Sequence, residues 1–124
     1  MESKVSAIRQ IAITVRDVAK ALTFYRDVLG LDFLFSPNPD LAFLRAGTIR
    51  IMLSTPQGAG TVGINSVLYF AVSDIDKAHA AVVARGAESE RGPQMIAQME
   101  DHELWISFLR DPDGNLIGLM EERR

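Results

Sequence analysis

Hydrophobic and polar residues alternate in the first predicted strand. Ile11, Ile13 and Val15 share one face of residues 10–15, and the opposite face begins with Gln10. Successive side chains of a strand point to opposite sides. The pattern therefore predicts a strand with one face packed in a core and a second face that is less hydrophobic.

A helical spacing of apolar residues follows, from Val18 to Leu29, at intervals of three and four. This spacing places the apolar side chains along one side of a helix. Asp17 precedes the pattern as an N-cap, and Gly30 follows it at the position where many helices end. We predict an amphipathic helix over residues 18–29 that packs on a sheet.

The second half of the chain repeats this order. Residues 68–78 (LYFAVSDIDKA) align with residues 11–21 (IAITVRDVAKA), and a second helix follows, with Asp74 or Ser73 as its N-cap and Gly86 at its end. Further strands are predicted over residues 31–36, 41–47, 49–54, 103–110 and 115–121, with a weaker one at 87–91. Each half therefore predicts a βαβββ unit in an α+β fold.

The chain of 124 residues is long enough for one domain, residues 1–124, with a buried core. The repeat divides it into module 1, about residues 8–54, and module 2, about residues 65–121. A Gly-rich linker, residues 55–64, joins the modules. Residues 91–102 are expected to be a second irregular stretch.

Composition excludes several classes of function. The formal net charge of −3 gives no signal for nucleic-acid binding. No apolar run approaches the length of a membrane span, and the N-terminus lacks the apolar core of a signal peptide. The chain has no cysteine, so it has no disulfide, thiolate metal site or cysteine nucleophile. We expect a cytoplasmic protein without membrane or nucleic-acid partners.

Residues 11–33 (IAITVRDVAKALTFYRDVLGLDF) and 108–121 (FLRDPDGNLIGLME), set in paired βαβββ modules, resemble the vicinal oxygen chelate superfamily. This is the group of glyoxalases, bleomycin-resistance proteins and dioxygenases, and the resemblance covers roughly residues 8–121. It implies that two tandem modules form a cupped eight-stranded mixed sheet around a ligand pocket. In metal-dependent members, the resemblance implies one divalent ion held by His, Gln or Glu from four strands.

Carried over to this chain, the four ligand positions correspond to Gln10, Met52, Val67 and Gly118. Only Gln10 offers an oxygen, whereas a divalent ion needs about three or more protein ligands. We therefore expect no metal and no other cofactor. Gln10 is predicted either to line the pocket or to be a strand-end amide satisfied by backbone or water.

Strand alternation from Gln10 sends further side chains to the same predicted groove. Arg50 could bind a carboxylate there, or form a salt bridge at the rim. Trp105 could stack on a ligand if it points inward, or pack in the core, and the pattern does not fix its face. The predicted ligand-binding residues are Gln10, Thr14, Arg50, Met52, Val67, Tyr69, Trp105 and Gly118.

Candidates for acid–base chemistry are few. His102 has acidic neighbours in MEDHE and could act as a general acid or base, or belong to a solvated loop. His79 lies on the core-facing stripe of the second helix and is expected to pack there. Asp111 and Asp113 lie in a Pro-Gly turn, which favours turn hydrogen bonds over paired-carboxylate chemistry.

Two functions remain open from the sequence. The first is a metal-free protein, similar to the bleomycin-resistance branch, that binds a small organic molecule in the cup. The alternative is an enzyme resembling glyoxalase I, a lyase or an epimerase, with an atypical metal site or metal-independent acid–base chemistry. The acidic balance weakly favours a cationic ligand. Family members commonly pair, so a homodimer is expected.

Overall fold

The computed structural model describes residues 3–56 and 60–124, so residues 57–59 of the predicted linker lie outside the described residues. The elements of module 1 are β1 (Gln10–Thr14), α1 (Val18–Leu22), the π-helical segment η1 (Thr23–Val28), β2 (Asp32–Asn38), β3 (Leu41–Ala46) and β4 (Ile49–Ser54). The elements of module 2 are β5 (Leu68–Ala71), α2 (Ile75–Ala84), β6 (Glu88–Gln98), β7 (Glu103–Arg110) and β8 (Leu116–Arg123).

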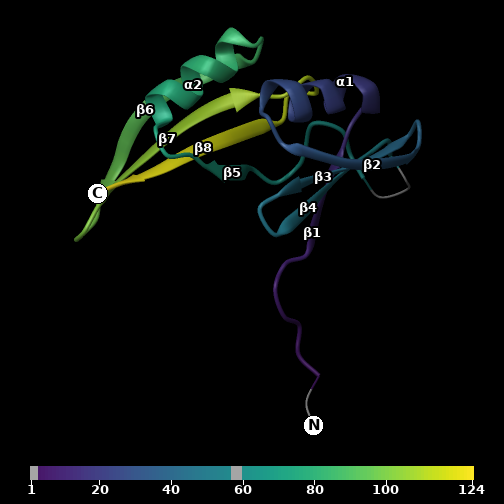
Figure 1. Ribbon diagram of the computed structural model, residues 1–124, viewed down its shortest axis with the longest axis horizontal. Coiled ribbons are helices and arrows are strands. Elements are labelled where there is room, and N and C mark those ends of the chain that lie inside the picture. The colour runs from purple at the N-terminus through teal and green to yellow at the C-terminus, as the bar shows by residue number, and fades with distance from the viewer. Residues whose placement is uncertain (1–2, 57–59) are drawn as a thin grey trace.

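The strands form two four-stranded mixed sheets, in the orders β1-β4-β3-β2 and β5-β8-β7-β6. The pairs β1–β4 and β5–β8 are parallel and the other pairs are antiparallel. This confirms the predicted repeat of two βαβββ modules. No strand pair joins the two sheets among the described residues. The eight strands of one chain therefore do not close into a single sheet, and β1 and β5 are both edge strands (Figure 1).

The helices begin where the sequence predicts. The Asp17 carboxylate accepts a hydrogen bond from the Lys20 amide at 3.2 Å, and Asp74, rather than Ser73, caps α2 by accepting from the Lys77 amide at 3.1 Å. The first helix differs from the prediction beyond α1, because it widens into η1.

Each helix covers one face of its own sheet, and the two helices lie on the same side of the molecule (Figure 1). Ile13 on β1, Val15 directly after it, and Ile117 and Leu119 on β8 face this helical layer. They belong to one hydrophobic core shared by both modules. The opposite faces of the two sheets carry no helix. We call them the helix-free faces.

Residues 91–102, predicted to be irregular, are mostly strand: β6 runs to Gln98 and pairs with β7. The register between the two strands shifts at Ser89/Arg91 and at Arg91/Gln94, around Gly92 and Pro93. These irregularities interrupt the alternation of side chains without ending the strand, because an edge strand tolerates bulges and proline. The prediction was therefore wrong over residues 91–98.

The modules are joined at the turn between β7 and β8. The buried Tyr25 hydroxyl of η1 donates a hydrogen bond to Asp111 at 2.7 Å, and the Arg16 amide donates to Asp113 at 3.2 Å. Asp111 also accepts from the amides of Asp113 and Asn115, which confirms the predicted turn role of these aspartates. None of the helices in the described ranges has the length and apolar character needed to cross a membrane.

Candidate functional site

The helix-free face of the first sheet holds a cluster around Arg50. Arg50 Nε donates a hydrogen bond to Gln10 Oε1 at 2.6 Å, and the Gln10 amide nitrogen lies 3.7 Å from Met52 Sδ. The Arg50 guanidinium lies over the Phe43 ring, 5.4 Å from its centroid. Register explains the cluster, since Gln10 pairs with Arg50 and Met52 with Phe43. We call Gln10, Phe43, Arg50 and Met52 the Arg50 cluster.

Two neighbours extend the Arg50 cluster toward the outer strand. The Phe35 ring stacks on Phe43 with 4.7 Å between centroids. Arg45 lies directly opposite Arg50 in the β3–β4 register and pairs with Asp32 at 3.1 Å. This face therefore combines stacked aromatic rings with two guanidinium groups.

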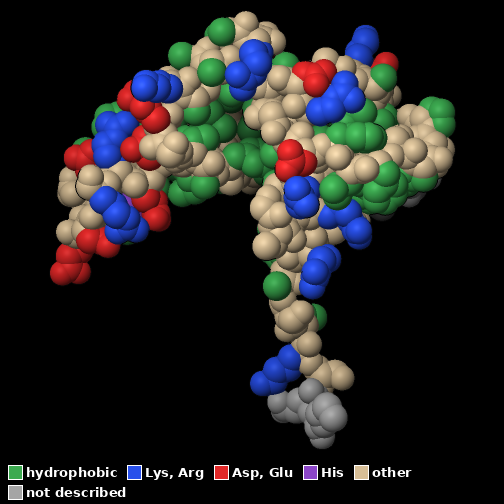
Figure 2. All heavy atoms as spheres, viewed as in Figure 1, with side chains coloured by type: hydrophobic (Ala, Val, Ile, Leu, Met, Phe, Trp, Pro, Cys, Tyr) green, Lys and Arg blue, Asp and Glu red, His purple; other side chains and the backbone are tan. Residues whose placement is uncertain are grey.

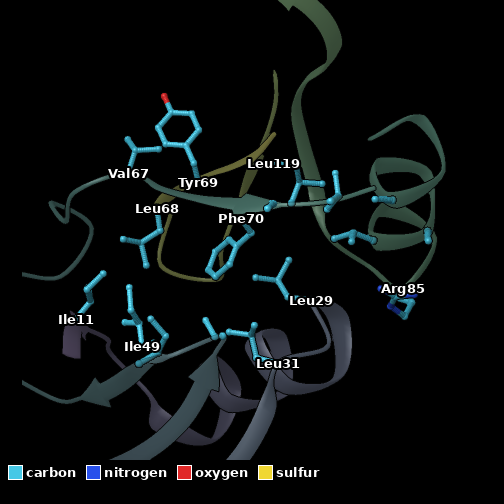
Figure 3. Close-up of a pocket in the computed structure, with 18 residues that line it drawn as sticks. Ile11, Leu29, Leu31, Ile49, Val67, Leu68, Tyr69, Phe70, Arg85 and Leu119 are labelled. Atoms are coloured by element: carbon cyan, nitrogen blue, oxygen red, sulfur yellow. The ribbon is translucent and has the colours of Figure 1, made fainter. Parts of the chain in front are cut away.

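The helix-free face of the second sheet holds a cluster around Tyr69. The Tyr69 ring meets Phe108 edge-on with 5.9 Å between centroids, and the Arg91 guanidinium lies 5.0 Å from the Phe108 centroid. Gly118 lies beneath Tyr69, and a Cβ atom on Gly118 would be only 2.5 Å from the Tyr69 ring. Val67 precedes Tyr69 and shares its direction (Figure 3). We call Tyr69, Arg91, Phe108 and Gly118 the Tyr69 cluster.

The remaining predicted ligand-binding residues lie apart from these clusters. Thr14 is half-buried. Gly60 lies against its hydroxyl so closely that a Cβ atom on Gly60 would overlap it. Trp105 packs on the core beneath the Arg123 guanidinium, which lies 4.2 Å from its ring centroid. Trp105 shares its face of β7 with the core residue Leu109, so it lies on the helical side and away from the Tyr69 cluster.

His102 lies at the far end of the second sheet, next to the C-terminus. Its Nδ1 is 2.7 Å from the Asp101 carboxylate and its Nε2 is 3.8 Å from Glu122. The hydrogen bond with His102, followed by that with Arg124, lowers the pKa of Asp101. No hydrogen bond or ion pair of the described residues links His102 to either cluster. His102 lines a separate, open pocket together with Glu103 and Arg123.

His79 is buried, as the sequence predicted. Its two ring nitrogens each lie 2.9 Å from a serine hydroxyl, Ser107 on β7 and Ser89 on β6. Burial lowers the pKa of His79. The neutral imidazole is therefore a structural link between α2 and the second sheet.

A cavity of about 670 Å³ lies between the modules, mostly on their helical side. Ile11 and Ile49 contribute one wall, and Leu68 and Phe70 contribute the other (Figure 3). The lining is mostly apolar, and hydrophobic side chains gather in the hollow between the modules (Figure 2). Sequence reasoning placed the groove on the other side of the strands. Of the predicted ligand-binding residues, Val67 and Tyr69 line this cavity.

The four positions that the resemblance assigns to metal ligands do not fit a metal ion. The Gln10 oxygen is already bound to the Arg50 guanidinium, a cation, and the space above Gly118 holds the Tyr69 ring. Met52 and Val67 have no oxygen or nitrogen in their side chains. Across residues 3–56 and 60–124, no three His, Asp or Glu side chains gather where they could hold an ion.

Sequence reasoning missed Phe43, Phe108 and Arg91. The first two occupy matching places in the repeated tripeptide FLR, residues 43–45 and 108–110. The leucine that follows each is in the core, so alternation could have assigned both rings to the helix-free faces. Arg91 is the residue at which the predicted weak strand, 87–91, meets the stretch taken as irregular, and no signal placed it beside a ring.

Comparisons with known proteins agree on one family. Residues 7–119 match the family described as the Glyoxalase/Bleomycin resistance protein/Dioxygenase superfamily. The uncharacterized protein YraH of Bacillus subtilis (strain 168) is 31% identical in an alignment that covers 87% of this chain and 92% of YraH. Lactoylglutathione lyase from Agrobacterium tumefaciens has a TM-score of 0.75 at 25% identity, covering 95% of both chains. TnmS3, an antibiotic binding protein from Streptomyces sp. CB03234, has a TM-score of 0.76 at 22% identity, covering 98% of this chain and 99% of TnmS3.

Proposed function

Because the chain belongs to the Glyoxalase/Bleomycin resistance protein/Dioxygenase superfamily, we propose that it binds a small organic molecule on its helix-free faces without a metal ion. The supporting observation is the composition of those faces. The Arg50 and Tyr69 clusters present aromatic rings and guanidinium groups at and beside the positions that would hold metal ligands. Mostly apolar surfaces with a few convergent polar groups suit small organic ligands. TnmS3, named as an antibiotic binding protein, is a precedent for binding in this fold.

The proposed active form is a homodimer. Phe33, Leu34 and Phe35 on the edge strand β2 are 42%, 39% and 48% exposed, and Tyr69 is 46% exposed. Exposed apolar edges favour association with another chain unless they are covered. Among the described residues, no hydrogen bond or ring contact joins the two helix-free faces of one chain, so a second copy can complete each binding cup.

The cavity between the modules supports the same assembly. The unpaired edge strands β1 and β5 border it through Ile11, Leu68 and Phe70. The cavity is open to solvent, and exposed apolar surface of this kind favours association, because covering it removes apolar area from water. Equivalent side chains of a second copy would fill the space and bring the strand edges of two chains together. In this assembly residues 1–124 act as a single domain with both modules contributing to binding.

The dimer is tested by light scattering during gel filtration. We expect twice the chain mass of 13.7 kDa for the wild type, and a shift toward monomer for Leu68→Lys, which places a charge in the cavity. Val83→Lys on α2, where the valine is already 38% exposed, is the control and should remain dimeric. A monomeric wild-type protein would contradict the proposed dimer and would leave the binding proposal open to its own test.

The binding function is tested with protein purified without chelator. We expect no stoichiometric divalent metal and no effect of EDTA on the melting temperature. A saturating ligand from a panel of small aromatic metabolites should raise Tm by on the order of 10 °C. Phe43→Ala should abolish that rise, whereas Val83→Ala should retain it. Tightly held metal, with a fall in Tm on EDTA treatment, would reject the metal-free proposal. The lack of cysteine supports a cytoplasmic location, which cell fractionation can test.

A further inference from the structure

We propose that the ligand of this protein is an anionic aromatic molecule, recognised by Arg50 and Arg91. This inference rests on the proposed function, because it concerns the ligand that the helix-free faces bind. The mildly acidic balance of the whole chain favours a cation instead. The charges close to the binding residues, rather than the net charge of the chain, determine which ligand charge is preferred. This is because charges beyond about 8–10 Å are largely screened at physiological salt.

The positive charge around Arg50 is not balanced. Arg45 lies directly opposite Arg50 in the register, and Asp32 pairs with Arg45 at 3.1 Å. Arg50 itself has no carboxylate partner among the described residues, because its polar partner is the neutral amide of Gln10. Like charges opposite each other on neighbouring strands are destabilising. A bound anion would remove this repulsion.

The hydrogen bond to Gln10 leaves the free end of the guanidinium available. Arg50 Nε is committed to Gln10 Oε1 at 2.6 Å, while no acceptor is recorded for the two terminal nitrogens in the described ranges. These nitrogens form a planar fork that matches the two oxygens of a carboxylate. The stacking on Phe43 further limits the orientations that this fork can take. Gln10 therefore acts as a positioning residue for Arg50.

The second sheet repeats the combination of cation and ring. Arg91 lies over Phe108, and no carboxylate pairs with it in the part of the chain that the structure describes. Its neighbour Glu90 is bound to Arg110 at 2.9 Å. Arg91 faces Phe108 in the register as Phe35 faces Phe43 in the first module. A ring that joins these stacks gains offset or edge contacts, and its acidic group gains a guanidinium partner.

The inference is tested by calorimetry on the full-length protein with three probes that share one ring system. The probes are 1-naphthoate, the neutral 1-naphthalenemethanol and the cationic 1-naphthylmethylammonium. We expect naphthoate to bind about tenfold or more tightly than the alcohol, since hydrogen bonds to charged groups contribute roughly that factor, and the cation to bind most weakly. Higher salt should reduce the difference.

Variants assign the selectivity to the two arginines. Arg50→Gln and Arg91→Gln should each weaken naphthoate binding about tenfold and weaken binding of the alcohol much less, so that the preference for the anion falls. Arg50→Lys should be intermediate, because it keeps the charge and loses the fork. Arg26→Gln is the matched control: it removes the same charge from a surface pair with Asp27 on η1. Circular dichroism and melting confirm that each variant folds.

The outcomes separate the two proposals. If the three probes bind equally well, or both glutamine variants bind naphthoate like the wild type, the inference about ligand charge is wrong and small-molecule binding stands. If none of the probes binds the wild-type protein, both proposals are rejected for this class of ring. Charge selectivity that disappears in Arg26→Gln as well would show a general charge effect, and would also overturn the inference.

Discussion

Replacing Tyr25 with phenylalanine tests the contact that joins the two modules. The Tyr25 side chain is completely buried, and its hydroxyl donates to Asp111 Oδ2 at 2.7 Å. Asp111 is 5% exposed and has no cationic partner in the described ranges. Its carboxylate depends on donors from Asp113 and Asn115 in the turn and on the tyrosine hydroxyl. Tyr25→Phe removes one donor and leaves the rest of the packing in place.

The expected cost follows from the charge on the acceptor. A hydrogen bond to a charged group contributes about 1.5–3 kcal/mol, and the cost is larger when the acceptor stays buried. We therefore expect Tyr25→Phe to lower the free energy of unfolding by about 2 kcal/mol. For a chain of this length the melting temperature should fall by about 8 °C.

Urea unfolding at fixed protein concentration measures the effect. Tyr69→Phe is the matched control, because Tyr69 is 46% exposed and no hydrogen bond is recorded for its hydroxyl. It should change stability by less than about 0.5 kcal/mol. Equal effects of the two substitutions would refute the reasoning, since they would show that the bond between Tyr25 and Asp111 contributes nothing beyond burial of the ring.

The pH dependence gives a second readout of the same bond. Burial, and then the negative charge of Asp111, raise the pKa of Tyr25 above its ordinary value. The protonated phenol therefore contributes stability below pH of about 10, where the unfolded chain is also protonated. Above that pH only the unfolded chain ionises, and the contribution falls. The difference between wild type and Tyr25→Phe should narrow as the pH rises from 9 to about 11.

Two further predictions concern Gly118 and His79. Gly118→Ala should push the Tyr69 ring off Phe108, lower stability by about 1 kcal/mol in urea unfolding and weaken naphthoate binding. The added Tyr69→Ala substitution should recover the stability but not the binding, and an unchanged Tyr69 NMR environment in Gly118→Ala would contradict the expected clash. His79 should make stability fall as the pH drops below about 6.5, because the unfolded chain takes up a proton that the buried imidazole resists. His79→Leu should be less stable at pH 7 and show a flatter profile from pH 7 to about 5; equal slopes would exclude His79 as the cause.

Local patterns predicted the elements of this fold, but not how the two sheets relate. Asp17 and Asp74 mark the helix starts because an N-cap acts on the next few amides only. The π-helical segment after Leu22 has no comparable signal in the sequence. Its buried residues, Phe24 and Tyr25, fit the spacing of an ordinary α-helix equally well. The division into two sheets depends on whether β1 meets β5, and alternation within a strand carries no information about that pairing.

The candidate site was predictable where alternation was regular. Gln10, Arg50 and Met52 share a face because β1 and β4 alternate without a break. Trp105 could not be assigned, because Leu104 and Ile106 are also apolar and either face could have been the core. Arg91 could not be predicted, because the register shifts on either side of it determine on which face of the sheet its side chain lies.

The positions that the resemblance assigns to metal ligands are coupled to their neighbours in the two sheets. Met52 and Gly118 occupy equivalent places, opposite Phe43 and Phe108 in their sheets. The Tyr69 ring requires a residue without a side chain at Gly118, and the ring in turn packs on Phe108. A carboxylate introduced at position 118 would therefore displace the Tyr69 ring. A substitution at Gly118 is consequently a test of the packing of the Tyr69 cluster as well as of binding.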